Sequence, residues 1–186
     1  MATTEILLTS ARSVKDKTSI SDNLAGKFLL PAIREVQETR FRQVTGGCLL
    51  DRLKELVQDG DITTEGFEAY RELLSRAQYF LAYAAAAECC VKASYKLSNA
   101  GISRTTDENL QAATFNEVAQ MRDYYTYKAD SACRELQRWM RANRASFPEL
   151  NGCGCDGPNL GSSASCPIYL GGARGKILPG GGGCCE

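Results

Sequence analysis

Residues 77–90 read AQYFLAYAAAAECC, and this stretch decides how the chain folds. Its only charged residue is Glu88, and its small and aromatic side chains cover nearly every side of a helix. A helix that is apolar all round is normally central and buried. No Pro occurs between residues 65 and 96, and Gly66 lies only at the start. The sequence therefore predicts a long central helix over residues 65–96, with alanines that let neighbouring helices approach closely.

Three further helices are predicted around this one. Residues 31–45 form the first, because Pro31 suits the first position of a helix and Gly46 ends it. Residues 49–58 form the second, and a turn follows at 59–61. The third runs from a capping box, Thr114-x-x-Glu117, to about residue 144. Its expected apolar stripe is Val118, Met121, Tyr125, Ala129, Ala132, Leu136 and Met140.

A long inter-helix loop is expected over residues 97–113, where turn-forming residues break the helical pattern. Within it, residues 101–104 are able to pair as a short strand. The alternation of apolar and polar residues that an all-β domain requires is missing from the sequence. The predicted fold class is therefore all-α, a bundle of about four helices, two of them long, with an extended C-terminal tail.

The chain changes character at Pro148. Residues 149–186 contain eleven Gly and five Cys but almost no apolar pattern, so they cannot bury enough surface to fold alone. Residues 1–19 are polar and aperiodic after the short apolar run at 6–8, as in an arm that is extended or mobile. Three parts are predicted: an N-terminal arm (1–19), a helical body (20–148) and an extended Gly- and Cys-rich tail (149–186).

Charge and hydropathy exclude several classes of partner. Twenty-two Lys and Arg balance twenty-two Asp and Glu, so bulk electrostatics do not favour nucleic acid or a membrane surface. The chain has neither a basic leader followed by a long apolar run nor about 18 consecutive apolar residues. We expect no secretion signal and no membrane partner.

Cysteines invite two interpretations. Without a secretion route, Cys48, Cys89, Cys90 and Cys133 are expected to be reduced, buried small hydrophobes. The tail cysteines are candidate zinc ligands, although their spacing differs from the usual C-x2-C pairs. They are Cys153, Cys155, Cys166, Cys184 and Cys185. A zinc- or thiol-dependent helical binding module with a Cys-rich tail stays open as the alternative hypothesis.

Catalytic signatures are missing from the sequence. The chain has no His, no HExxH, no GxSxG and no P-loop. Its carboxylates occur at spacings expected of solvated or ion-paired helix faces. We therefore expect a protein that is not an enzyme and needs no cofactor.

One stretch of the tail carries anchors for a partner. Residues 166–176 read CPIYLGGARGK, in which Ile168, Tyr169 and Leu170 precede two cations, Arg174 and Lys176. An extended peptide that adds to another surface needs such anchors, whereas a bare linker does not. We expect these five residues to dock on a subunit or another protein; a flexible linker is the competing interpretation.

Three arginines lie near the end of the last predicted helix: Arg138, Arg141 and Arg144. Cations there complement the negative end of the helix dipole, which is the simplest explanation. Ion pairs between subunits, or a ring lumen that faces DNA, are the two functional alternatives.

Four stretches in order carry a resemblance to a known family: FLLPAIREVQ (28–37), YFLAYAAAAE (79–88), SYKLSNAGISR (94–104) and CPIYLGGARGK (166–176). Together they resemble head–tail connector proteins of tailed bacteriophages that infect Bacteroidetes, including crAss-like phages. The resemblance spans most of residues 20–176. The terminal GGGG and CCE runs match no part of it.

The resemblance implies a small helical adaptor without enzymatic activity, located in the virion after assembly in the host cytoplasm. Its partners would be itself in a dodecameric ring, the portal protein above it, and the next tail or ring protein below. The ring would extend the DNA channel, with non-specific proximity to packaged DNA. Contacts would come from the 1–19 arm, the 97–113 loop and the tail around Tyr169, Arg174 and Lys176.

Overall fold

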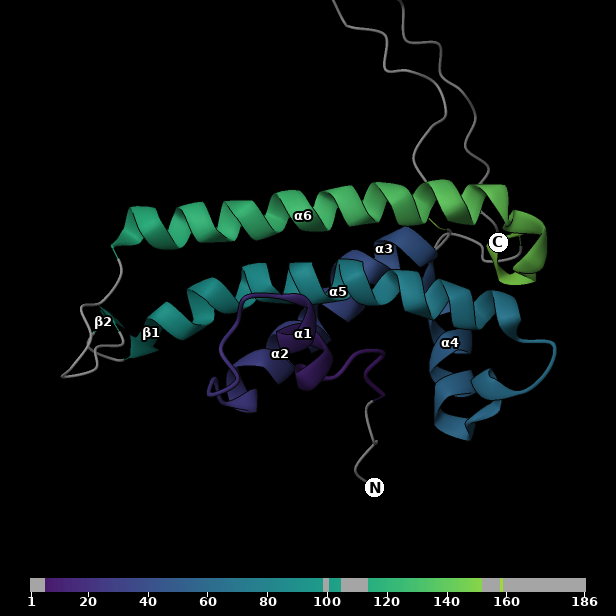
Figure 1. The fold of residues 1–186 in the computed structure, drawn as a ribbon, viewed down its shortest axis with the longest axis horizontal. Helices are drawn as coiled ribbons and strands as arrows, with labels where there is room; N and C mark the ends of the chain where they lie inside the picture. Colours follow the sequence, from purple (N-terminus) through teal and green to yellow (C-terminus); the bar gives the residue numbers. More distant parts are fainter. Residues whose placement is uncertain (1–5, 99–100, 105–113, 152–157, 159–186) are drawn as a thin grey trace, which may run out of the picture.

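The computed structural model describes residues 6–98, 101–104, 114–151 and 158. Two long helices, α5 (Glu68–Ser94) and α6 (Phe115–Ala142), lie side by side (Figure 1). Helices α1, α2 and α4 lie on the opposite side of α5, whereas α3 lies near the junction of α5 and α6 (Figure 1). Helix α5 is therefore central. This arrangement confirms the predicted all-α bundle with two long helices.

Helix α5 is buried on several sides, as its composition predicts. Gly66, at a φ of 95°, precedes it, and neither Gly nor Pro interrupts it. Its residues belong to three hydrophobic clusters, one shared with α4 and α6, one with α1 and α2, and a small one with Tyr125 of α6. Ala82, Ala84, Ala85 and Ala86 are fully buried, and their small side chains allow this close approach.

Helix α6 begins at the predicted capping box. The backbone N–H of Glu117 donates to Thr114 Oγ1 over 3.3 Å, and the Glu117 carboxylate accepts from the Thr114 backbone N–H over 2.6 Å. The helix buries one narrow stripe against α5, so most of its surface is exposed. The buried residues are Val118, Tyr125, Ala129, Leu136 and Met140. Two residues of the predicted stripe are not fully buried: Met121 is exposed and Ala132 is only partly buried.

The helix predicted from Pro31 starts earlier than expected. Helix α2 (Gly26–Val36) continues without a break into the π-helical turn η1 (Gln37–Phe41) and helix α3 (Arg42–Thr45). Pro31 therefore lies inside the helix, and its assignment to the first position is wrong. The physical reason is burial on both sides of the proline, since Leu29 and Ile33 are each fully buried.

The N-terminal arm is not extended throughout. Residues 11–17 form helix α1 (Ala11–Lys17), which begins where Ser10 Oγ accepts from the backbone N–H of Ser13 over 3.1 Å. Val14 is fully buried against α2 and α5, and Leu8 belongs to the main core. The expectation of an extended or mobile arm is therefore wrong for Leu8 and for residues 11–17, which pack as part of the body.

Helix α4 (Gly47–Asp59) confirms the second predicted helix and is two residues longer at its start. Gly46, at a φ of 78°, separates it from α3, and Gly60, at a φ of 80°, ends it in the left-handed region that favours glycine. A 3-10 turn, η2 (Asp61–Thr63), then leads toward α5.

A two-stranded antiparallel hairpin caps the far end of the long helix pair. Strand β1 (Tyr95–Ser98) pairs with β2 (Gly101–Arg104), and Tyr95 lies opposite Arg104. The short strand expected at 101–104 is confirmed. Residues 99–100 and 105–113 of the predicted loop lie outside the described residues.

The body extends past the predicted boundary at 148. Two 3-10 turns, η3 (Arg144–Ser146) and η4 (Pro148–Asn151), follow α6. Phe147 is fully buried with its ring 5.2 Å from that of Tyr70, and Leu150 belongs to the main core. Apart from Pro158, the rest of the tail lies outside the described residues.

Candidate interaction surface

The three predicted arginines each find an acceptor nearby in their own segment. Arg138 pairs with Glu135 over 2.7 Å, and Arg141 Nε donates to the Gln137 carbonyl over 3.3 Å. Arg144 Nε donates to Asn151 Oδ1 over 3.0 Å, which joins η4 to η3, the turn that follows α6. These contacts fit the simple explanation of cations at a helix C-terminus. They leave all three side chains exposed to solvent.

The predicted docking residues of the tail, Ile168, Tyr169, Leu170, Arg174 and Lys176, lie outside the described residues. So do the five tail cysteines on which a zinc site would depend. Within the described part of the chain, no three His, Cys, Asp or Glu side chains gather closely enough to hold a metal ion.

The described cysteines differ in burial and in bonding. Cys48 is exposed on α4 and disulfide-bonded, so its prediction as a buried, reduced thiol is wrong. Cys89 is buried, whereas Cys90 and Cys133 are half-buried, and these three are free. Burial raises the pKa of the Cys90 thiol to about 11 and also raises the pKa of Cys89 and Cys133. These thiols stay protonated at neutral pH and are poor nucleophiles.

The most developed surface feature follows the seam between α5 and α6. One side of α6 carries residues spaced three or four positions apart, so they form a single row beside the buried stripe. The row is Glu117, Met121, Tyr124, Lys128, Ser131 and Glu135. Three hollows follow one another along it, and we call them together the seam groove.

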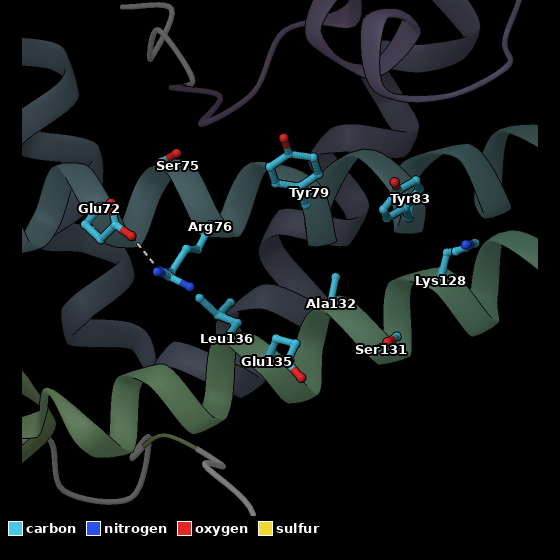
Figure 2. A pocket seen from close by; sticks show the side chains of 10 residues that line it. All are labelled: Glu72, Ser75, Arg76, Tyr79, Tyr83, Lys128, Ser131, Ala132, Glu135 and Leu136. Atoms are coloured by element: carbon cyan, nitrogen blue, oxygen red, sulfur yellow. Dashed lines mark hydrogen bonds and ion pairs between the residues drawn. The ribbon is translucent and has the colours of Figure 1, made fainter.

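The first hollow lies toward the C-terminal half of α6 and has a volume of about 480 Å³. Figure 2 shows α5 residues along one side and α6 residues along the other, with Arg76 and Leu136 between the two helices. Its carboxylates are Glu72 and Glu135, and Glu72 pairs with Arg76 over 2.7 Å (Figure 2). This end of the groove is polar at its rim.

The other two hollows lie toward the N-terminal end of α6 and share Glu117 and Met121. One, of about 450 Å³, is bordered by Ser19 and Tyr124. The last, of about 320 Å³, is mostly apolar. Its lining includes Ile20, Leu24, Ala86, Ala93, Val118 and Met121. Glu117 is a carboxylate at this end, and it accepts from the Thr114 backbone N–H in the capping box. The groove therefore changes from mostly apolar at one end to more highly charged at the other.

Exposed apolar side chains concentrate on the two long helices. Of seven large apolar residues exposed in the described part of the chain, six belong to α5 or α6, and Tyr79, Met121 and Tyr124 border the seam groove. Tyr79 and Tyr124 are each 52% exposed. Cations already stack on both rings, Lys17 at 5.5 Å from Tyr79 and Lys128 at 5.7 Å from Tyr124. Such a surface is suited to binding another protein.

Sequence reasoning missed the seam groove. The available signal was a second row on α6, next to the predicted apolar stripe, in which Tyr124 and the stripe residue Met121 recur at helical spacing. The groove itself needs residues of α5 and α6 that are far apart in the sequence. Their pairing becomes known only from the fold.

A family model described as "Family of unknown function (DUF6712)" matches residues 41–159, which is more than half of the chain. Neither a curated protein nor a solved structure matches the chain. Among the described helices, none is long and apolar enough to cross a membrane.

Proposed function

The chain belongs to the DUF6712 family of unknown function, and we propose that it is a structural virion protein, a head–tail connector without enzymatic activity. It forms a ring between the portal and the tail and extends the DNA channel. Its partners are copies of itself, the portal protein and the next tail or ring protein.

The exposed aromatic surface of helix α6 carries this proposal. α6 buries only one stripe against α5, and Met121 and Tyr124, which lie beside that stripe, remain about half exposed. Exposed apolar area of this kind is unfavourable in water, and burying it stabilises an assembly by about 25 cal/mol for each Å². A ring of identical subunits covers such a surface in every copy at once.

The resemblance to phage connectors supports the same function. Three of the four stretches that carry it lie in the structural framework: residues 28–37 in α2 and the start of η1, residues 79–88 in the centre of α5, and residues 94–104 in the hairpin region. The fourth stretch, at 166–176, lies outside the described residues. The resemblance therefore covers both the packed body and its projecting end.

The two ends of the long helix pair suit different neighbours. The hairpin projects at one end of the pair (Figure 1). Arg138, Arg141 and Arg144 are exposed at or just after the C-terminal end of α6. In a ring, these arginines either pair with acidic groups of the next subunit or face packaged DNA. Replacing all three by Gln separates the possibilities, because weaker ring formation indicates subunit pairs, whereas intact rings with altered DNA retention indicate the channel.

Two measurements test the connector role. Mass photometry of the purified full-length chain, alone and with the portal protein, should show a closed oligomer of uniform mass. Mass spectrometry of purified virions should find the chain in a fixed ratio to the portal. A chain that stays monomeric in both mixtures and does not occur in particles would overturn the proposal.

Elemental analysis of the same purified chain examines the zinc alternative. The connector role predicts no stoichiometric metal. One zinc per chain, lost on Cys153→Ser or Cys166→Ser, would instead favour a metal-dependent binding module.

A further inference from the structure

We propose that the seam groove receives residues 166–176 from the tail of a second copy of this chain. This inference deepens the self-association proposed above and rests on it. Three observations indicate this occupant. Two are properties of the groove, its length and the order of its apolar and charged ends. The third is the path of the chain that leaves the body.

The lengths of groove and segment agree. Along α6, the groove runs from the level of Val118 to that of Glu135, about 26 Å at the rise of an α-helix. An extended chain from Ile168 to Lys176 also spans about 26 Å. The segment can therefore touch both ends of the groove at once without coiling or stretching.

Alternation along an extended chain places the right side chains on one face. Successive side chains of a strand point to opposite sides, so the even-numbered residues share a face. That face carries Ile168 and Leu170 at one end and Arg174 and Lys176 at the other, with Gly172 between. The order matches a groove that is mostly apolar near Val118, where the Glu117 carboxylate already accepts from the Thr114 backbone N–H, and that carries Glu72 and Glu135 at its far end.

The charges of the tail segment complement those of the groove. Arg174 and Lys176 reach the level of Glu72 and Glu135, whose present pairs with Arg76 and Arg138 are exposed and therefore weak and easily exchanged. Arg76 also stacks 5.3 Å from the Trp139 ring, which keeps it partnered when Glu72 changes its contact. The groove's other cation, Lys128, lies about 15 Å from the Val118 end, opposite Gly172, where no like charge meets it.

The path of the chain favours a second copy over the segment's own body. The described chain reaches Asn151 beside the C-terminal end of α6, the end with the carboxylates. Within one copy, residue 168 would have to travel to the far end and the chain would then have to reverse. The fourteen residues between 151 and 166 span up to about 50 Å, so the segment is long enough to leave its own body.

Site-specific photocrosslinking of the full-length chain tests the proposal. Two versions with different affinity tags are co-expressed, and only one carries a benzophenone amino acid in place of Leu170. We expect crosslinked products that contain both tags, with the attachment between residues 117 and 124. If no product carries both tags, or if the attachment lies elsewhere on the body, the inference would be overturned.

Matched variants make the test specific to the groove. Tyr124→Ala should lower the yield of the two-tag product about tenfold, the loss of one aromatic contact of about 1.4 kcal/mol. Tyr127→Ala makes the same change on α6 at a residue that lines none of the three hollows, and the yield should not change. Equal losses in both variants would contradict docking in the groove.

Charge exchange supplies a result that misfolding cannot produce. Arg174→Glu should lower the yield two- to fivefold, and adding Glu135→Lys should restore it. Absence of rescue would overturn the assignment of Arg174 to this end of the groove. The crosslink needs no virion, so a chain that links copies but never enters particles would refute the connector role alone. A chain that enters particles without this crosslink would refute the inference alone.

Discussion

Gln37 joins the N-terminal segment to the body through both groups of its side-chain amide. Its Oε1 accepts from the Leu8 backbone N–H over 2.8 Å, and its Nε2 donates to the Ile6 carbonyl over 2.9 Å. The side chain is fully buried at the start of the π-helical turn. A buried polar residue of this kind is tolerated because its hydrogen bonds are satisfied.

Gln37→Leu should therefore destabilise the fold by about 1–3 kcal/mol. Most of the loss comes from the buried Leu8 N–H, because water can still reach the partly buried Ile6 carbonyl. Urea unfolding measures the change, and hydrogen exchange of the Leu8 amide should accelerate. Gln58→Leu on the exposed face of α4 is the control, with an expected change within about 0.5 kcal/mol. Equal effects in the two variants would contradict the role of Gln37.

Tyr70 connects α5 to the last turn of the body and should make stability depend on alkaline pH. Its hydroxyl donates to both Glu149 carboxylate oxygens over 2.8 and 2.9 Å. Burial and, next, the Glu149 carboxylate raise the pKa of Tyr70 from 10.0 to about 12. The folded state thus holds the proton more tightly, and this stability is complete below pH 10 and lost as pH rises toward about 12.

Tyr70→Phe should lower the free energy of unfolding by about 1 kcal/mol at neutral pH. This difference from the wild type should vanish as the pH rises from 10 to about 12. Urea unfolding at several pH values measures the difference, and tyrosinate absorbance follows the titration. Tyr127→Phe is the control, because this side chain is 66% exposed. It should not change the free energy of unfolding at any of these pH values. A constant difference at all pH values would rule out Tyr70 as the titrating group.

At the scale of elements, α6 depends on its first turn. Thr114→Ala removes the side-chain half of the capping box and should destabilise the protein by about 1 kcal/mol. Fraying should appear as faster hydrogen exchange over residues 115–118. Thr126→Ala lies mid-helix, where the hydroxyl only bonds back to the Arg122 carbonyl, and should be neutral or slightly stabilising. A larger loss from Thr126→Ala would contradict this account.

Elements encoded by local signals could be predicted from the sequence. The capping box, the absence of breakers in α5 and the glycines flanking α4 act within a few residues of themselves. Helix α1 was missed because Val14 is its only buried apolar residue, too little for a periodic pattern. Pro31 was misplaced because its preference for a first position is local, whereas burial of Leu29 and Ile33 depends on the tertiary structure.

At the scale of the whole molecule, α5 connects the parts. All three hydrophobic clusters include residues of α5. Separating one partner helix from α5 therefore exposes buried residues of α5 itself. We therefore expect a single cooperative unfolding transition of the body. The central burial of α5 could be predicted from its composition, but the seam groove could not, because it requires the relative rotation of α5 and α6.

Ala85→Leu should show how closely the helices approach α5. Ala85 is fully buried among Leu29, Ile33 and Val14, and the larger side chain should push α1 and α2 away at a cost of about 1–3 kcal/mol. Urea unfolding monitored by circular dichroism measures this loss. Ala142→Leu makes the same change at the exposed end of α6 and should stay within about 0.5 kcal/mol. An unchanged Ala85→Leu midpoint would mean that this packing is loose.

The buried stripe of α6 has a mechanical consequence. Val118, Ala129 and Met140 recur every eleven residues, and so do Tyr125 and Leu136. This hendecad spacing corresponds to 3.67 residues per turn, close to the 3.6 of an undistorted helix, whereas heptads impose a left-handed supercoil. The two long helices can thus remain in contact while running nearly straight. A straight pair of this kind should resist bending better than a single helix, and its register depends on these five side chains.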